Sequence, residues 1–477
     1  MEKMKKIVGC ALCLLALPVM AACGSKSKLS TPSGGGGGNT QQPGSGDEGR
    51  EAGNGNPGAK RATATIAWPA EAGPIVWGYD LKQPESAKGF TNAMARSVLI
   101  DDGMTIVRVP IFLNSFDPTT HKIIPTETRT ATALAAAKEA MKVRPGVKVF
   151  ASLKLDNDNG RTTFPEWAYN AQLKRVRTDV YADMLTEYLL YMKNNGVPVH
   201  YLAIDNEPEY TASGIQGSTY SMYIDILDGV RRKTASLGVD MPTQFVAPEC
   251  YGPKQEYIDL VANVISADRG DLITILGTHY YPLYRNANLL GRLKKLVEAG
   301  QGRPLWNTEA HYDALSEAQI AKGWNEMDRA NLFMVATFDG FDQGCNGMFF
   351  WAYKRDESNA KGSLSRKLVQ TTVGATHAAI DINSGKDAVD RGFNIRAFVR
   401  DRSVAVWIAN TDSQVKDYTI EVAGHKLGSD ASYSIWNDAV WNRKPYTQVA
   451  GSVVVAGDVA TITIPARSIS LVEFSLQ

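Results

Sequence analysis

Two short segments combine acidic and polar residues in a pattern suited to acid–base chemistry. The first reads IDNEP and contains Glu207, and the second reads WNTEA and contains Glu309. Hydrolysis of a glycosidic bond requires two carboxyl groups, one on each side of the bond that breaks. One group must be protonated to donate to the leaving oxygen, and the other must be ionised to attack the anomeric carbon. Because an isolated Asn-Glu-Pro can also be the capped first turn of a helix, this interpretation depends on where the fold places the two glutamates.

Short apolar runs alternate with amphipathic helical patterns over residues 71–383. Eight runs are almost continuously hydrophobic, as strands buried on both faces require. These runs are Ile75–Leu81, Thr105–Phe112, Lys148–Leu155, Tyr201–Asp205, Gln244–Ala247, Ile273–His279, Pro304–Asn307 and Gly347–Trp351. The last helix is expected at about Lys367–Asp381. The alternation predicts parallel βα units, and eight such units close as an α/β (β/α)8 TIM barrel. A doubly wound open sheet is the alternative, but no GxGxxG follows the first run.

The barrel prediction decides how the two acidic segments are interpreted. In such barrels the active site lies at the C-terminal ends of the strands. Glu207 follows the fourth run and Glu309 follows the seventh. Strands four and seven lie across the barrel mouth from each other, so their end residues can face each other across a sugar. We therefore interpret Glu207 and Glu309 as a catalytic pair.

The chain is organised differently on either side of the barrel. Residues 384–477 contain period-two runs separated by turn residues, which predicts a C-terminal antiparallel β-sandwich. Thr63–Trp68 alternates in the same way, so residues 62–70 are expected to add an N-terminal strand to that sandwich. Residues 23–61 are rich in Gly, Ser and Pro, a composition that cannot bury a core and predicts a flexible tether.

Residues 1–22 have the composition of an export signal. A basic start precedes the apolar run Ile7–Val19, and small residues stand directly before Cys23. A cysteine in this position resembles a bacterial lipobox, which implies cleavage before Cys23 and acylation of its thiol. We therefore expect an exported lipoprotein that contacts the membrane only through this lipid, in the periplasm or at the cell surface. An ordinary signal peptide with a chance cysteine is the alternative.

Charge and cysteine content exclude several other classes of protein. The 51 Lys and Arg residues almost balance 50 Asp and Glu residues, whereas nucleic-acid binding requires a one-sided positive field. Cys10 and Cys13 lie in the expected signal, and the rest of the sequence has neither a CxxC motif nor a His/Cys cluster that would indicate a metal site. Cys250 and Cys345 remain after processing, and we expect them at opposite rims of the barrel and therefore not bridged. The expected partner is a polysaccharide or oligosaccharide, with no metal or organic cofactor, and the expected state is a monomer.

These residues carry a resemblance to known enzymes. Asn-Glu-Pro after strand four, with Glu after strand seven, resembles glycoside hydrolase clan A, whose members retain anomeric configuration. The surrounding sequence is most similar to glycoside hydrolase family 30, over roughly Thr63 to Gln477. The resemblance implies that Glu207 is the acid/base and Glu309 the nucleophile. One departure is that the first strand reads VWGYDL, where family 30 has the Gly-rich form GFGG.

The resemblance also implies roles for five further residues. Arg108 in IVRVP would stabilise the charge of the nucleophile, and Asn206 would bind the sugar 2-hydroxyl. His279 and Tyr281 in THYY would line the site, with Tyr281 hydrogen-bonded to the nucleophile. Trp351 in FFWAY would be the aromatic floor for the sugar. Structural roles remain the alternatives, because Arg108 could pair a buried acid and the other side chains could belong to the core.

Residues near the predicted mouth could add contacts to a glycan. Four aromatic residues could stack on sugars, although packing is the commoner role: Trp77, Tyr79, Trp167 and Tyr251. Four cations could bind a uronic acid, although a solvated rim is the commoner role: Arg161, Arg285, Lys354 and Arg355.

The sequence therefore predicts a retaining β-glycoside hydrolase with exo or endo action. A tethered glycan-binding lipoprotein without catalysis is the alternative, since a fold does not fix a function. A purely structural surface protein does not account for the paired motifs. The presence of both carboxylates together with Asn206, Arg108 and Tyr281 favours the enzyme.

Overall fold

The computed structural model describes residues 62–68, 73–154, 164–238, 243–281, 287–311, 317–351, 353, 360–383, 393–441 and 448–477. The expected signal segment 1–22, Cys23 and the tether 23–61 lie outside these residues. Among the described helices, none combines the length and the apolar character needed to cross a membrane.

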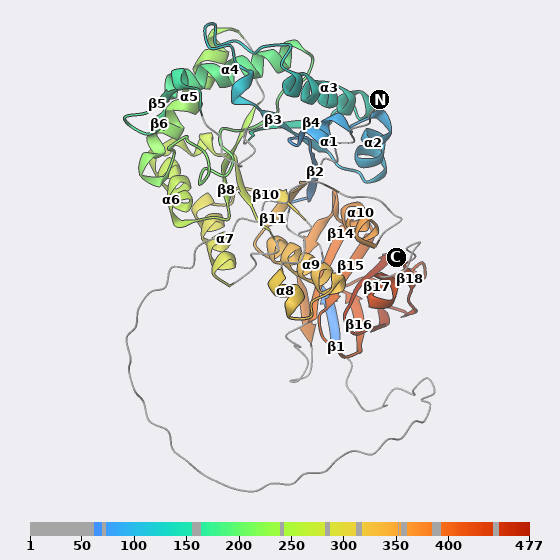
Figure 1. Cartoon of the computed structure of the whole chain (residues 1–477). Coiled ribbons are helices and arrows are strands. Elements are labelled where there is room, and N and C mark those ends of the chain that lie inside the picture. The colour runs from blue at the N-terminus through green and yellow to red at the C-terminus, as the bar shows by residue number, and fades with distance from the viewer. Residues whose placement is uncertain are drawn as a thin grey trace, which may run out of the picture. The chain divides into compact units, whose positions relative to one another are not determined.

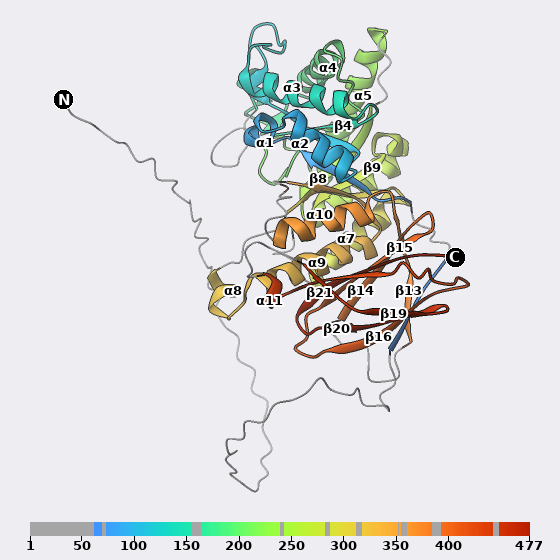
Figure 2. The same ribbon diagram turned by 90° about the vertical axis from the view of Figure 1, so that its right-hand side faces the viewer.

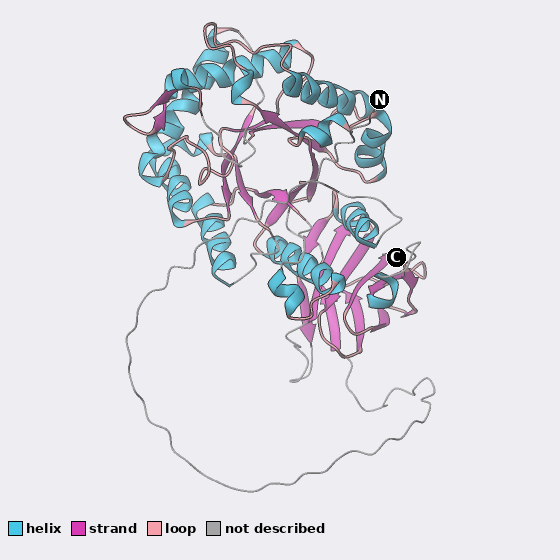
Figure 3. Ribbon diagram, in the orientation of Figure 1, coloured by secondary structure: helices cyan, strands magenta, loops and turns pink. Residues whose placement is uncertain are grey.

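Eight parallel strands close into a barrel, seen end-on in Figures 1 and 3. In chain order they are β2 (Val76–Asp80), β3 (Ile106–Ile111), β4 (Lys148–Leu153), β7 (Tyr201–Ala203), β8 (Gln244–Tyr251), β9 (Ile275–His279), β10 (Leu305–Ala310) and β11 (Cys345–Phe350). Each strand pairs with the next, and β11 returns to pair with β2. The barrel prediction is confirmed, and the open-sheet alternative is wrong because the sheet has no free edge.

Helices surround the barrel strands, as Figure 3 shows. The longer ones are α3 (Thr128–Val143), α4 (Thr178–Asn194), α5 (Tyr220–Ser236), α6 (Gln255–Val264), α7 (Ala287–Gly300), α9 (Glu326–Asp342) and α10 (Ala360–Thr372). Shorter ones are α1 (Pro84–Lys88), α2 (Asn92–Arg96) and α8 (Glu317–Ala321). Their apolar faces bury against the outer side of the strands. Ile226, Leu227 and Val230 on α5 are at most 2% exposed, which is the outcome expected for an i, i+1, i+4 stripe.

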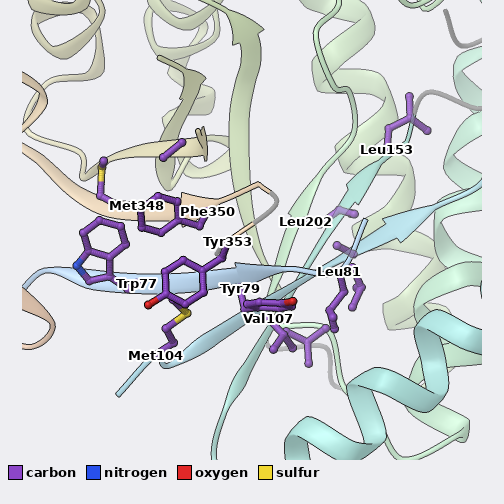
Figure 4. Packing of buried hydrophobic residues seen from close by; sticks show 14 of the residues in the cluster. Trp77, Tyr79, Leu81, Met104, Val107, Leu153, Leu202, Met348, Phe350 and Tyr353 are labelled. Carbon is purple, nitrogen blue, oxygen red and sulfur yellow. The ribbon is translucent and has the colours of Figure 1, made fainter. Parts of the chain in front are cut away.

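Alternate residues of each barrel strand face opposite sides. On β2 and β11, the outer side carries Trp77, Met348 and Phe350, which pack together in Figure 4. The rings of Trp77 and Phe350 are stacked with their centroids 5.1 Å apart. The inner side carries Phe349, which belongs to a separate cluster that fills the barrel below its mouth: Ile106, Phe150, Ala203, Val246, Ile275, Trp306 and Phe349. This apolar floor lies beneath the polar groups at the C-terminal end of the barrel.

Two sheets form the sandwich. One has the order β13-β1-β16-β20-β19 and the other β12-β14-β15-β21-β17-β18. The strands are β1 (Ala62–Ile66), β12 (Thr376–Ala378), β13 (Ile380–Asn383), β14 (Phe393–Arg400), β15 (Ser403–Asn410), β16 (Lys416–Val422), β17 (Ser432–Asn437), β18 (Val449–Ala450), β19 (Val453–Ala456), β20 (Val459–Ile464) and β21 (Ser468–Ser475), with the short helix α11 at Asp438–Trp441. Strand β1 lies between β13 and β16, so the N-terminal strand joins the C-terminal sandwich as predicted.

The boundary between barrel and sandwich differs from the expected position at residues 383 and 384. Helix α10 ends at Thr372, not near Asp381, and Gly374 follows it in the left-handed region at φ +71°. Strands β12 and β13 then enter the two sandwich sheets. Both strands are short, so their pattern was too brief to separate from the end of a helix.

Helix α10 connects the two parts, and Figure 2 shows α9 and α10 beside the sandwich strands. The indole of Trp77 on β2 donates to Thr372 Oγ1 at 2.8 Å. The indole of Trp407 on β15 donates to the neighbouring Thr371 Oγ1 at 2.9 Å. Adjacent threonines of one helix thus bond a barrel strand on one side and a sandwich strand on the other.

Candidate active site

Buried polar side chains converge at the C-terminal ends of the barrel strands. The chain segments that supply them are the ends of β2, β3, β4, β7, β8, β9 and β10. Eight of the residues are buried, namely Asp80, Lys82, Arg108, Ser152, Asn206, Glu249, His279 and Glu309, and two are partly buried, Glu207 and Tyr281. Glu207 and Glu309 thus lie at the barrel mouth, as the sequence predicts.

Glu309 is held by cations on one carboxylate oxygen and by a phenol on the other. Arg108 Nη1 donates to Glu309 Oε1 at 2.7 Å, and Lys82 Nζ donates to the same oxygen at 3.2 Å. The Tyr281 hydroxyl donates to Oε2 at 2.6 Å. Burial raises the pKa of the Glu309 carboxyl, but the charges of His279, Lys82 and Arg108 and the Tyr281 hydrogen bond outweigh that effect and place the pKa well below its usual range. Glu309 is therefore ionised at neutral pH.

Glu207 lies in the loop after β7 and is more exposed. Its side chain is 13% exposed, whereas that of Glu309 is 9% exposed. Glu207 Oε1 and His279 Nδ1 share a hydrogen bond of 2.8 Å. The ring nitrogen donates to an ionised carboxylate and accepts from a protonated carboxyl. His279 can therefore stay hydrogen-bonded to Glu207 whether the Glu207 carboxyl is protonated or ionised.

The two glutamate side chains are close together. A carboxylate oxygen of Glu207, Nδ1 of His279 and a carboxylate oxygen of Glu309 all lie within 4.8 Å of one another. The space between the carboxyl groups is therefore narrow, and a sugar carbon can reach both from opposite sides.

Two glutamates of the site have a strained backbone. Glu207 has φ +47° and Glu249 has φ +57°, a region that residues with a Cβ rarely adopt. The amide of Glu207 donates to the carbonyl oxygen of Glu249 at 2.8 Å. The ends of β7 and β8 thus fix each other, and this bond holds Glu207 in a conformation that aims its side chain at the mouth.

Arg108 connects the other members of the site. Its side chain is fully buried, and its two terminal nitrogens donate to five side chains. The acceptors are Asp80 (2.9 Å), Ser152 (3.1 Å), Asn206 (3.0 Å), Glu249 (2.6 Å) and Glu309 (2.7 Å). The sequence left two roles open for Arg108, contact with the proposed nucleophile and pairing of a buried acid. Arg108 has both roles.

Four members of the site were not identified from the sequence: Asp80, Lys82, Ser152 and Glu249. The sequence pattern predicts that the fifth run ends at Ala247, whereas β8 continues to Tyr251, so the pattern does not place Glu249 in a strand. Asp80 and Lys82 stand at the end of the first run, in the segment that departs from the family pattern. The rule that located Glu207, an ionisable residue at the end of a barrel strand, also applies to them.

Asn206 and Trp351 are the two remaining residues that the resemblance assigned to the site, and of these two only Asn206 is hydrogen-bonded to other described members. Asn206 accepts from Lys82 and Arg108 through Oδ1, which orients its amide group. Trp351 follows β11 and is half-buried. Its ring meets the ring of His311 edge-on, with the centroids 5.0 Å apart. Among the described residues, no hydrogen bond joins Trp351 to either of the two carboxylates.

The aromatic residues expected at the mouth are mostly packing residues. Trp77 is fully buried, and Tyr79 packs on Phe90 on the outer side of the barrel. Trp167 stacks on His121 at 4.1 Å. Tyr251 is the exception, because its ring lies 5.5 Å from that of Tyr281. The four cations Arg161, Arg285, Lys354 and Arg355 lie outside the described residues.

The Glu207, His279 and Glu309 side chains also form a cluster of the residue types that bind metals. The geometry does not favour a cation there. Both oxygens of Glu309 already accept hydrogen bonds, and two of the donors, Arg108 and Lys82, are positively charged. A metal ion would face these fixed charges at close range.

Cys250 and Cys345 are both free and buried. Cys250 lies near the C-terminal end of β8, and Cys345 is the first residue of β11. Parallel strands place these positions at opposite ends of the barrel, so the prediction that they are not bridged is confirmed.

Comparison with known proteins gives similarity over most of the chain. No family model matches it. The glucuronoxylanase XynC of Bacillus subtilis (strain 168) is 24% identical over 353 residues, which are 70% of this chain and 75% of that protein. A family 30 endoxylanase from Clostridium papyrosolvens C71 has a TM-score of 0.60 at 19% identity and covers 87% of this chain and 100% of its own. The endo-β1,6-glucanase BT3312 has a TM-score of 0.58 at 13% identity, over 87% and 94%.

Proposed function

We propose that this chain, which is a glycosidase similar to glycoside hydrolase family 30, hydrolyses a β-linked glycan with retention of anomeric configuration. The observation that carries the proposal is the pairing of Glu309, held ionised, with Glu207, because one carboxylate oxygen of each residue lies within 4.8 Å of the other. Retaining enzymes have carboxyl groups about 5–5.5 Å apart, whereas inverting enzymes have them about 6.5–9.5 Å apart to admit a water molecule. The narrow separation favours retention.

The proposed reaction has two steps. In the first, a carboxylate oxygen of Glu309 bonds to the anomeric carbon, the bond to the leaving oxygen breaks, and Glu207 gives that oxygen its proton. In the second, the oxygen of a water molecule bonds to the anomeric carbon while Glu207 takes its proton, and the electron pair of the ester bond returns to Glu309.

Glu207 must change its protonation state between the two steps, and its surroundings permit this. The hydrogen bond to His279 Nδ1 can run in either direction. Glu309 has no such freedom, because guanidinium, ammonium and phenol groups are all donors to it. A glycan-binding lipoprotein without catalysis would have no use for this asymmetry between two adjacent acids.

Xylans and β-glucans are the first substrates to test. The relative that is similar over 70% of this chain is a glucuronoxylanase, and proteins of similar fold include an endoxylanase and an endo-β1,6-glucanase. The proposed substrate class is therefore a polysaccharide of β-linked xylose or glucose units.

We further propose that the chain is exported and held at the cell envelope by a lipid on Cys23. The basic start, the apolar run and the small residues before Cys23 support this. Replacing Cys23 with Ser should move the protein from the membrane fraction to the soluble fraction of cells that express it. Equal recovery of both forms in the membrane fraction would contradict the lipid anchor.

The proposed activity is tested by a substrate screen followed by product analysis. Dinitrophenyl β-xyloside, β-xylobioside, β-glucoside and β-gentiobioside, together with glucuronoxylan and β-1,6-glucan, form the screen. Proton NMR of the first product should show the β-anomer before mutarotation. An α-anomer appearing first would mean inversion, and no cleavage of any substrate would count against the proposed class.

A further inference from the structure

Lys82 follows β2 in the segment where this sequence departs from the Gly-rich first strand of family 30. We infer that Lys82 is a second cationic partner of Glu309 that accelerates breakdown of the glycosyl-enzyme. The inference rests on the proposed retaining mechanism and adds to it a residue for the second step.

Lys82 is buried and makes hydrogen bonds through both its ammonium group and its backbone amide. Its side chain is 2% exposed, and Nζ donates to Glu309 Oε1 at 3.2 Å and to Asn206 Oδ1. Its backbone amide donates to Asp80 Oδ1 at 2.6 Å. The other oxygen of Asp80 accepts from Arg108, so Asp80 ties together the two residues that donate to Glu309 Oε1. Hydrogen bonds thus hold both the backbone and the ammonium group of Lys82.

A second cation is not needed to form the site. Arg108 already donates to Glu309 Oε1 and Asn206 Oδ1, the two atoms that Lys82 contacts. A buried ammonium group is costly to desolvate, and its presence beside an arginine that duplicates its contacts calls for a functional reason. That reason lies in the charge of Glu309, which changes during the reaction.

The two steps change that charge in opposite directions. Formation of the ester bond removes the negative charge of Glu309, so a nearby cation stabilises the starting state of the first step. Breakage of the ester returns the electron pair to Glu309 as water attacks the anomeric carbon, so the same cation stabilises the developing carboxylate in the second step. Lys82 therefore speeds the second step and not the first.

The charge on Lys82 depends on pH. Burial and the adjacent Arg108 guanidinium lower the pKa of the Lys82 ammonium to about 8. Esterification of Glu309 removes a negative charge that raises this pKa, so the pKa falls further in the glycosyl-enzyme. The charged groups around Lys82 are Asp80, Arg108, Glu249 and Glu309, and beyond Glu309 lie Glu207, His279 and Tyr281.

Glu207 and His279 can also affect how kcat depends on pH, so their effects must be distinguished from that of Lys82. Glu207 acts as a base in the second step and therefore limits that step only on the acid side. His279 is the competing group on the alkaline side, because the adjacent carboxylates outweigh its burial and raise its pKa above the usual value. Arginine does not deprotonate in this range, so Lys82→Arg distinguishes Lys82 from His279.

The test uses whichever dinitrophenyl β-glycoside of the screen is cleaved fastest, because its first step needs no acid and the second step limits kcat. Lys82→Met and Lys82→Gln should lower kcat about 10- to 100-fold, the loss expected for one charge-assisted hydrogen bond. KM should fall at least as much as kcat, leaving kcat/KM unchanged or higher, because the cation no longer stabilises the starting state of the first step. The glycosyl-enzyme trapped by the 2-deoxy-2-fluoro analogue should be released more slowly by the same factor. Lys88→Met, at an exposed site on α1, is the matched control and should behave as wild type.

Glutamine retains a donor for Asn206 but lacks the charge, so it separates positioning of Asn206 from stabilisation of Glu309. In wild type, kcat should decline as pH rises through about 8 or below, and the decline should be absent in Lys82→Arg. A decline that persists in Lys82→Arg would assign it to His279 and overturn the pH role of Lys82. A kcat/KM that falls as much as kcat, or an unchanged kcat, would overturn the inference while leaving the retaining mechanism intact. An inverted product from wild type would overturn both, because no glycosyl-enzyme would form.

Discussion

At the scale of single residues, two glutamates of the same chemistry acquire different roles from their neighbours. Glu309 accepts hydrogen bonds from Arg108, Lys82 and Tyr281, all of which favour its ionised form. Glu207 is bonded to His279, which can donate or accept. These opposite environments support the proposed roles of Glu309 as nucleophile and Glu207 as acid/base.

The first prediction concerns this division of roles. Glu207→Ala should reduce the hydrolysis of substrates with poor leaving groups far more than that of a dinitrophenyl β-glycoside, because dinitrophenolate leaves without a proton. Added azide should accelerate the second step and yield a β-glycosyl azide, which product NMR identifies. Glu309→Gln should lack turnover on every substrate. Full activity of Glu309→Gln would show that another group is the nucleophile.

The second prediction concerns Glu249, which is fully buried and accepts from Arg108 and Ser152. Glu249→Gln removes a negative charge beside Arg108, and we expect the free energy of unfolding to fall by about 1–3 kcal/mol in urea titrations. Glu187 pairs with the exposed Lys122, and Glu187→Gln should change stability by less than about 0.5 kcal/mol. Equal effects of the two changes would mean that Glu249 is not part of a stabilising network.

At the scale of the elements, the barrel interior depends on large side chains facing glycines across neighbouring strands. A Cβ at Gly347 on β11 would lie 2.2 Å from Trp306 Cδ1 on β10. A Cβ at Gly78 on β2 would lie 2.3 Å from Phe349 Cδ1. These rings form the floor beneath the polar cluster, and the two glycines leave the space that the rings occupy.

The third prediction tests this packing. Gly347→Ala should lower the free energy of unfolding by about 1–3 kcal/mol, because the indole of Trp306 must move within a closed barrel. Gly291→Ala, on the exposed side of α7 with open space around it, should raise it by about 0.4–1 kcal/mol. Chemical denaturation of both variants measures the two changes. A neutral Gly347→Ala would mean that the barrel interior adjusts without cost.

At the scale of the whole molecule, both ends of the described chain build the sandwich, and α10 joins the sandwich to the barrel. Strand β1 pairs with β13 and β16 and buries Ala64 and Ile66 completely. Helix α10 bonds to β2 and β15 through adjacent threonines. The sandwich is therefore completed by residues that precede the barrel in the sequence.

The fourth prediction follows from this arrangement. A chain beginning at Gly73 lacks β1 and should expose the edges of β13 and β16, so we expect a lower Tm and increased aggregation. A chain beginning at Lys60 keeps β1 and should match the full chain in Tm and activity. Scanning calorimetry and turnover of the best screen substrate compare the three. Equal Tm values for the two shortened chains would show that β1 contributes nothing to the fold.

The sequence by itself determined the barrel, the sandwich and the positions of the two glutamates. The barrel strands are long apolar runs, and Glu207 and Glu309 stand at the ends of two of them, so local pattern and strand order were sufficient. Only the tertiary structure decided that further buried ionisable residues, beyond Arg108, His279 and Tyr281, join them. Glu249 and Lys82 belong to the site because closure of the barrel brings the ends of β2, β8 and β10 around Arg108. Those contacts span up to 227 residues of sequence, as between Lys82 and Glu309, and no local pattern records them.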